Sequence, residues 1–228
     1  MSSLIWTQVT TYAPFLWAGL EYSIRLTVVA AIAGLFLGTV LAVIRILGWR
    51  IASRIVSFYV NVTRAIPLLL VIFTVYIFTP IFLQWVLGLR YPPKVSAANS
   101  AYFTFALFEA AYYCEIIRAG INGVSKEQLN AAQALGLTKI QSMRFVVLPQ
   151  ALRVAIPMIV TQIIILFQDA SLVSLLNVID FVGAANIIAE RDGLLVEMYL
   201  IVAIVYLVIC GALSLMVGVL SKKFAIAK

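Results

Sequence analysis

The chain has 228 residues, of which 64% are hydrophobic and only 11% are charged, and its formal net charge is +7. Soluble domains are about 45–50% apolar and about 25% charged. They need the polar residues because a folded core must be covered by a surface that faces water. This composition excludes an ordinary soluble domain and predicts an all-α protein embedded in a lipid bilayer.

Long stretches without charge divide the sequence. A spanning helix needs about 20 apolar residues at about 1.5 Å each, and the first, second and last stretches reach that length alone. The third reaches it only if the helix carries Glu109, Glu115 and Arg118. The fourth reaches it only with Asp169 inside. The pattern predicts one domain, 1–228, with five membrane spans near residues 22–45, 57–80, 97–119, 150–176 and 198–220.

The basic residues are distributed unevenly between the two sides of these spans. Twelve of the sixteen Lys and Arg residues fall in the segments 45–64, 118–153 and 221–228. By the positive-inside rule these segments are cytoplasmic, so we expect a multi-pass inner-membrane protein with a periplasmic N-terminus and a cytoplasmic C-terminus. The same asymmetry explains the net charge, so we expect no nucleic-acid partner. No small-residue cleavage site follows a basic start, and no cleaved signal peptide is expected.

The residues needed for several kinds of chemistry are missing. The sequence contains no His, which excludes His-based zinc sites, Ser-His-Asp triads and His proton relays. It contains no G-x-x-x-x-G-K-[ST] run, so ATP is not expected to bind this chain through a P-loop. We expect no metal ion or cofactor on this chain, and any ATP to be bound by another subunit.

The segment 120–149, between the third and fourth predicted spans, has the pattern of two short helices. Ser125–Gln128 has the form of a capping box, and strong helix formers follow it. Gly136 suits a left-handed helix end, and Thr138–Gln141 has the form of a second capping box whose helix should end at Pro149. Anchoring of a loop at the membrane face and docking of a partner protein explain this pattern equally well.

The spacing of small and apolar residues in this loop matches a known pattern. The matching residues are Asn130, Ala131, Ala132, Gly136, Leu148 and Pro149. They resemble the E-A-A-x3-G-x9-I-x-L-P motif of permease subunits of bacterial ATP-binding-cassette importers, with Val146 in place of Ile. The resemblance implies a type I importer permease fold, in which this loop is the coupling helix that docks on the ATPase. Asn130 stands where the family usually has Glu, which removes a charge from that interface.

Other segments extend the resemblance over nearly the whole chain. They are Tyr59–Leu70, Phe108–Gly120, Gln168–Leu172, Arg191–Gly193 and Val196–Met198. They look most like permeases for polar amino acids, and within these like permeases of glutamate/aspartate importers. A permease for glutamine, histidine or arginine is the alternative. A secondary transporter, which should show internal repeats, or a membrane scaffold is a further alternative.

The resemblance also implies the partners. A periplasmic binding protein delivers the amino acid to a dimer of permease subunits, and an ATPase dimer that binds ATP and Mg drives alternating access. A five-helix chain does not easily enclose a pathway alone. The second permease subunit is expected to be a different, related chain.

Polar and charged residues within the predicted spans are candidates for the substrate pathway. A charge near the middle of the bilayer costs at least about 2.5–3.5 kcal/mol, so it usually faces a cavity or a partner. An acidic amino acid carries both signs of charge, and Arg is the better carboxylate ligand because its planar fork binds bidentately. The candidates are Arg64 for a carboxylate, Glu109 or Asp169 for the ammonium, and Tyr112, Tyr113, Gln168 and Ser171 as polar and aromatic neighbours.

Most of these candidates also have a structural explanation. Snorkelling to the cytoplasmic interface explains Arg64 equally well. Helix packing around a hydrogen-bonded acid explains the face formed by Glu109 and its two neighbouring tyrosines. Glu115 and Arg118 are three residues apart and are expected to form an internal ion pair.

Overall fold

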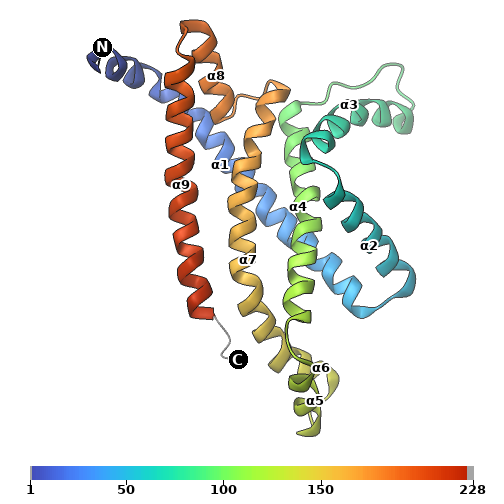
Figure 1. Cartoon of the computed structure of the whole chain (residues 1–228). Coiled ribbons are helices and arrows are strands. Elements are labelled where there is room, and N and C mark those ends of the chain that lie inside the picture. Colours follow the sequence, from blue (N-terminus) through green and yellow to red (C-terminus); the bar gives the residue numbers. More distant parts are fainter. Residues whose placement is uncertain (1, 225–228) are drawn as a thin grey trace. The chain divides into compact units, whose positions relative to one another are not determined.

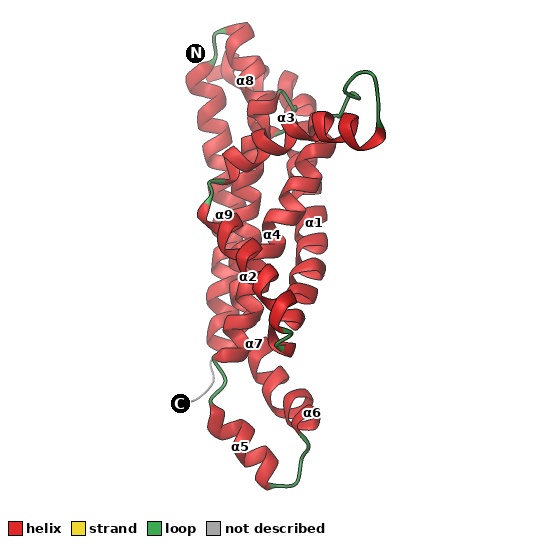
Figure 2. Cartoon of the chain, turned by 90° about the vertical axis from the view of Figure 1, so that its right-hand side faces the viewer, coloured by secondary structure: helices red, strands yellow, loops and turns green. Residues whose placement is uncertain are grey.

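The structure is a computed structural model that describes residues 2–224, with side chains described from Thr11 to Lys223. Every regular element in this range is a helix, which confirms the all-α class (Figure 1 and Figure 2). The elements are α1 (Ser2–Leu47), α2 (Arg50–Ala65), α3 (Leu68–Leu87), α4 (Ala97–Asn122), α5 (Lys126–Ala134), α6 (Lys139–Ser142), the π-helical turn η1 (Met143–Val147), α7 (Leu148–Asp169), the 3₁₀ segment η2 (Ala170–Leu176), α8 (Phe181–Asp192) and α9 (Leu195–Phe224).

Within the described residues, four helical stretches are long and apolar enough to cross a bilayer. They are Thr11–Leu47, Leu68–Leu87, Lys139–Leu176 and Leu195–Lys223. α4 has 26 residues but also carries Glu109 and Glu115, so its composition alone does not mark it as a span. It buries side chains along its length, among them Ala101, Phe105 and Tyr113. A helix covered by its neighbours needs no apolar surface toward lipid, which explains why α4 is less apolar than the others.

The predicted second span requires a correction. The sequence predicts one helix over 57–80, whereas α2 ends at Ala65 and α3 begins at Leu68. Pro67 has φ −57° and ψ 133°, an extended conformation that interrupts the helix. Its ring also disfavours a helical conformation of the residue before it, Ile66. Residues 65–80 carry no charge, which is why the sequence predicts a span here. The absence of charge does not reveal a break in the helix.

The other predicted spans fall within helical segments. Residues 22–45 lie in α1, 97–119 in α4 and 198–220 in α9, while 150–176 runs through α7 and the 3₁₀ segment η2.

In the loop 120–149 helices begin at the two positions that the sequence predicts. α5 occupies Lys126–Ala134, and Gly136 follows with a left-handed φ of +88°. The second capping box is present: the Gln141 N–H donates to Thr138 Oγ1 at 3.3 Å, and the Thr138 N–H donates to Gln141 Oε1 at 2.9 Å.

The first capping box, by contrast, is absent. Ser125 is the N-cap residue of α5, but its side chain accepts no hydrogen bond from the helix backbone. Hydrogen bonding to its own backbone and to Ser125 lowers the pKa of Glu127 below its ordinary value.

Pro149 does not end a helix, contrary to the prediction. The chain continues as a helix from Lys139 through η1 into α7, and Pro149 lies in the first turn of α7. In the π turn the Leu148 N–H donates to the Met143 carbonyl, five residues earlier. A proline ring in a regular α-helix collides with the carbonyl four residues earlier, and the wider turn relieves that collision.

The chain divides into two compact units. Unit 1 comprises Met1–Ile32, Ile66–Ala106 and Ile165–Gly211, and unit 2 comprises Ala33–Ala65, Leu107–Ile164 and Ala212–Lys228.

In unit 1 the start of α8 is fixed against α1. A Cβ atom on Gly19 would lie 2.6 Å from the carbonyl oxygen of Asp180, so only glycine allows this approach. The Phe181 N–H donates to the Ser23 hydroxyl at 3.2 Å. The buried Asp180 carboxylate caps α8 by accepting from the Gly183 N–H at 2.8 Å.

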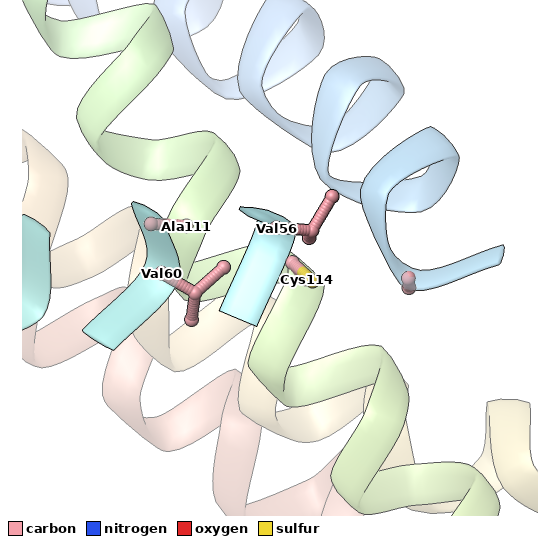
Figure 3. Close-up of a cluster of buried hydrophobic side chains, with 5 residues drawn as sticks. Val56, Val60, Ala111 and Cys114 are labelled. Atoms are coloured by element: carbon pink, nitrogen blue, oxygen red, sulfur yellow. The ribbon is translucent and has the colours of Figure 1, made fainter. Parts of the chain in front are cut away.

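In unit 2 a small apolar core joins three helices. Ala42 of α1, Val56 and Val60 of α2, and Ala111 and Cys114 of α4 form this buried cluster. In Figure 3 the two valines lie beside Ala111 and Cys114. The side chains are small, so the three helices approach closely here.

Two glycines bring α4 still closer to its neighbours in unit 2. A Cβ on Gly38 of α1 would lie 2.8 Å from the Ala110 carbonyl oxygen and from the Tyr113 Cβ. A Cβ on Gly120 of α4 would lie 2.9 Å from the Ala151 carbonyl oxygen of α7. Larger residues at either position would push α4 away from α1 or α7.

Candidate functional site

Glu109 lies near the middle of α4 and is 1% exposed. The buried Gln162 of α7 donates from Nε2 to Glu109 Oε1 at 3.1 Å. A buried carboxylate is costly unless it accepts hydrogen bonds, so this amide stabilises the acid in its place. The sequence did not single out Gln162, whose only signal is an amide within an otherwise apolar stretch.

Arg64 lies in the last turn of α2, just before the break at Pro67. Its guanidinium carbon is 5.3 Å from the centroid of the Tyr112 ring, which is a cation–π distance. The Tyr112 ring in turn lies 5.2 Å from the ring of Phe108. Arg64 is exposed and forms no ion pair with any residue that the structure describes. The ring covers one face of the guanidinium, and the N–H donors along its edge remain suited to a carboxylate.

Tyr113 has a different environment from Tyr112, its neighbour in α4. It is fully buried, and its Cβ packs where α4 crosses Gly38 of α1. Its hydroxyl has no hydrogen-bond partner among the described residues. Successive residues on a helix point in different directions, so the structure brings Tyr112 to Arg64 and places Tyr113 in helix packing.

The remaining pathway candidates lie in unit 1, at the transition from α7 to η2. Asp169 is the last residue of α7 and is half-buried, while Gln168 beside it is exposed. The Ser171 hydroxyl donates to the Gln168 carbonyl oxygen at 2.8 Å. Arg64, Glu109 and the two tyrosines belong to unit 2.

Glu115, farther along α4, is held by two arginines. Arg118 of the same helix donates from Nε to Glu115 Oε2 at 3.0 Å and from Nη2 to Glu115 Oε1. Arg45 of α1 donates from Nη1 to Glu115 Oε2 at 2.9 Å. The predicted pair of Glu115 and Arg118 is confirmed. Arg45, which the sequence presents only as one of the basic residues that set the topology, is a second partner.

The motif residues of the loop divide between its interior and its surface. Ala132 is 4% exposed, and α5 packs with η1. Asn130, Ala131 and Pro149 are exposed, and Leu148 is partly exposed. α5 and α6 lie beyond the ends of α4 and α7 in Figure 1 and Figure 2.

The turn at Gly136 is flanked by apolar side chains that the chain itself does not cover. Leu135 is 85% exposed, and Ile140 of α6 is 81% exposed. Large apolar side chains left uncovered in this way are typical of a surface that contacts another molecule.

Residues 30–226 match the family of binding-protein-dependent transport system inner membrane components. The chain belongs to this family and is a permease subunit of an ATP-binding-cassette importer, as the loop motif predicts. It is 45% identical over 220 residues to the glutamate/aspartate import permease protein GltK of Escherichia coli O6:H1, covering 96% of this chain and 98% of that protein. The glutamate/aspartate import permease protein GltJ of the same organism is 28% identical over 218 residues, covering 94% and 89%.

A solved structure supports the fold. A crystal structure of an amino acid ABC transporter with histidines superposes with a TM-score of 0.85 at 27% identity, covering 95% of this chain and 97% of that chain.

Proposed function

We propose that this chain forms half of the translocation pathway of an ATP-driven importer for the acidic amino acids glutamate and aspartate. The observation that carries the proposal is the 45% identity to GltK over nearly the full length of both proteins. Arg64, which pairs with no acid among the described residues, supports it, because an acidic amino acid has a second carboxylate that a guanidinium can bind.

The proposal includes five spans in the bacterial inner membrane, with the N-terminus periplasmic and the C-terminus cytoplasmic. α4 is the fifth span, in addition to the four that are apolar by composition, and its 26 residues extend over about 39 Å at the usual helical rise. The concentration of basic residues in 45–64, 118–153 and 221–228 supports the orientation.

The proposed assembly has four kinds of subunit. A second permease subunit completes the pathway, and its expected identity as a related but different chain is supported by the likeness of this chain to both GltK and GltJ. An ATPase dimer binds ATP and Mg and docks on α5 and the Gly136 turn. A periplasmic binding protein delivers the substrate. This chain itself is a translocation subunit without catalytic residues, cofactor or metal.

The proposed pathway residues have distinct roles. The Arg64 fork binds a substrate carboxylate, while the Tyr112 ring holds the guanidinium. Glu109, oriented by Gln162, or Asp169 accepts the substrate ammonium. Closure of the ATPase dimer moves α5 and α6, and η1 transmits that motion directly into α7 because the chain is helical without interruption from Lys139.

A permease for another polar amino acid is the second candidate, because the solved relative was determined with histidines. The test is reconstitution of the complete importer with its binding protein. We expect glutamate and aspartate to stimulate ATP hydrolysis, and glutamine, histidine and arginine not to do so. Stimulation by a basic amino acid alone would refute the acidic substrate. Failure of the chain to recover an ATPase subunit in a pull-down would refute the importer itself.

A further inference from the structure

Unit 2 contains a groove beside the loop that we assign to the ATPase. It has a volume of about 450 Å³, within the range of about 300–1,000 Å³ that ligand pockets have. It lies between the end of α1 and the segment formed by α6, η1 and the start of α7. Its lining includes four apolar side chains and two cations, Ile46, Leu47, Ile140, Leu148, Lys139 and Arg144.

The apolar part of the groove is open to its surroundings. Leu47 is 58% exposed, and Ile140 is 81% exposed. Leu47 is the last residue of the apolar stretch that begins at Thr11, so the groove opens where a membrane span ends. Trp49, two residues on, is 62% exposed, as expected for an aromatic side chain at the membrane interface.

The two cations in the groove have no acidic partner among the described side chains. Neither Lys139 nor Arg144 forms an ion pair with a residue in the described range. The Arg144 guanidinium carbon lies 5.5 Å from the ring of Phe145, which is itself 60% exposed. Two unneutralised cations beside an uncovered apolar slot fit a ligand that has an anionic head and an apolar chain.

We propose that this groove binds an anionic phospholipid of the cytoplasmic leaflet. The phosphate lies between Lys139 and Arg144, and an acyl chain lies along Leu47 and Ile140. A soluble anion would leave the apolar side chains uncovered, and a neutral lipid would leave the cations without a counter-charge. The bound lipid would brace the end of α1 against the segment that leads from the ATPase-docking loop into α7.

The test is native mass spectrometry of the complete importer complex with dioleoyl phosphatidylglycerol and dioleoyl phosphatidylcholine. We expect a retained phosphatidylglycerol that phosphatidylcholine does not replace. The double variant Lys139→Gln/Arg144→Gln should weaken that binding about thirtyfold, since each cation near an anionic lipid contributes about 1 kcal/mol. Ile140→Ser should weaken binding without changing the preference between the two lipids.

The matched control is Lys222→Gln/Lys223→Gln, which removes two exposed cations from the end of α9 and should leave binding unchanged. Equal losses in the two double variants would overturn the proposal, because they would show attraction to the overall charge. Competition by millimolar glycerol phosphate would show a plain anion site and would also overturn it. A lipid that binds the permease subunits alone but is absent from the complete importer would assign the groove to the ATPase instead and would also overturn the proposal.

Discussion

Two acids of α4, Glu109 and Glu115, lie six residues apart in the same unit and have opposite surroundings. Glu115 is neutralised by Arg45 and Arg118, whose side chains satisfy both of its oxygens. Glu109 is more deeply buried and accepts from a neutral amide, while Arg64 of the same unit stacks on the Tyr112 ring and pairs with no described acid. The ion pairs make the first region structural, whereas in the second we propose that Arg64 binds a ligand.

The largest effect on stability is expected when the first region loses its acid. Glu115→Leu leaves two partly buried arginines without a counter-charge, which we expect to lower the free energy of unfolding by about 3 kcal/mol. Thermal unfolding in lipid nanodiscs should then show a decrease in Tm of about 6–12 °C.

Glu21→Leu is the matched control for that variant. Glu21 pairs with Arg25, but their side chains are 60% and 65% exposed. Such a pair contributes little to stability, so its loss should leave Tm almost unchanged. Equal decreases in the two variants would contradict the structural role of Glu115.

The next largest loss of stability is expected at the contact of α1 with α4, which lies between Glu109 and Glu115 on α4. Gly38→Ala places a Cβ 2.8 Å from the Ala110 carbonyl oxygen, and the helices must separate, which we expect to cost about 2 kcal/mol. Gly218→Ala in α9 is the control, because its Cβ would meet no atom within 4 Å. A Tm for Gly38→Ala as high as for the control would show that the two helices are not in close contact.

A smaller effect is expected at the hydrogen bond that holds Glu109. Gln162→Leu removes one donor to the buried carboxylate at nearly constant side-chain volume, and we expect a loss of about 1 kcal/mol. Gln162→Glu should be worse, because it places two acids within hydrogen-bond distance of each other. Chemical denaturation of both variants checks this order, and a more stable Gln162→Glu would contradict it.

The smallest effect on stability is expected at Arg64. Arg64→Ala removes an exposed cation–π contact, which contributes about 0.5 kcal/mol. Its Tm should therefore match the parent protein within about 2 °C. A large decrease would indicate that Arg64 is structural, like Arg45.

The sequence correctly predicted the structural features that depend on the spacing of residues close together in the chain. The pair of Glu115 and Arg118 is three residues apart, and the loop helices follow from Thr138, Gln141 and Gly136. These features depend on residues within one or two turns of a helix, so their spacing alone is informative.

The features that the sequence did not predict depend on contacts between distant segments or on the steric effect of proline on the backbone. Arg45 and Glu115 are 70 positions apart, and Gln162 and Glu109 are 53 apart, so local spacing in the sequence does not pair them. The helix break at Pro67 and the π turn before Pro149 both result from the steric effect of a proline ring on the backbone. The length of an apolar stretch carries no information about this effect.

The central claim is that Arg64 binds the substrate. The direct measurement is ATP-driven uptake of labelled glutamate by proteoliposomes that contain the complete importer with Arg64→Ala, Arg64→Lys or Arg54→Ala. Arg54 is the matched control, an exposed arginine of the same helix. We predict at least about a tenfold loss for Arg64→Ala, a partial loss for Arg64→Lys because an ammonium cannot bind bidentately, and parental uptake for Arg54→Ala. Equal uptake by Arg64→Ala and Arg54→Ala in intact complexes would contradict the claim.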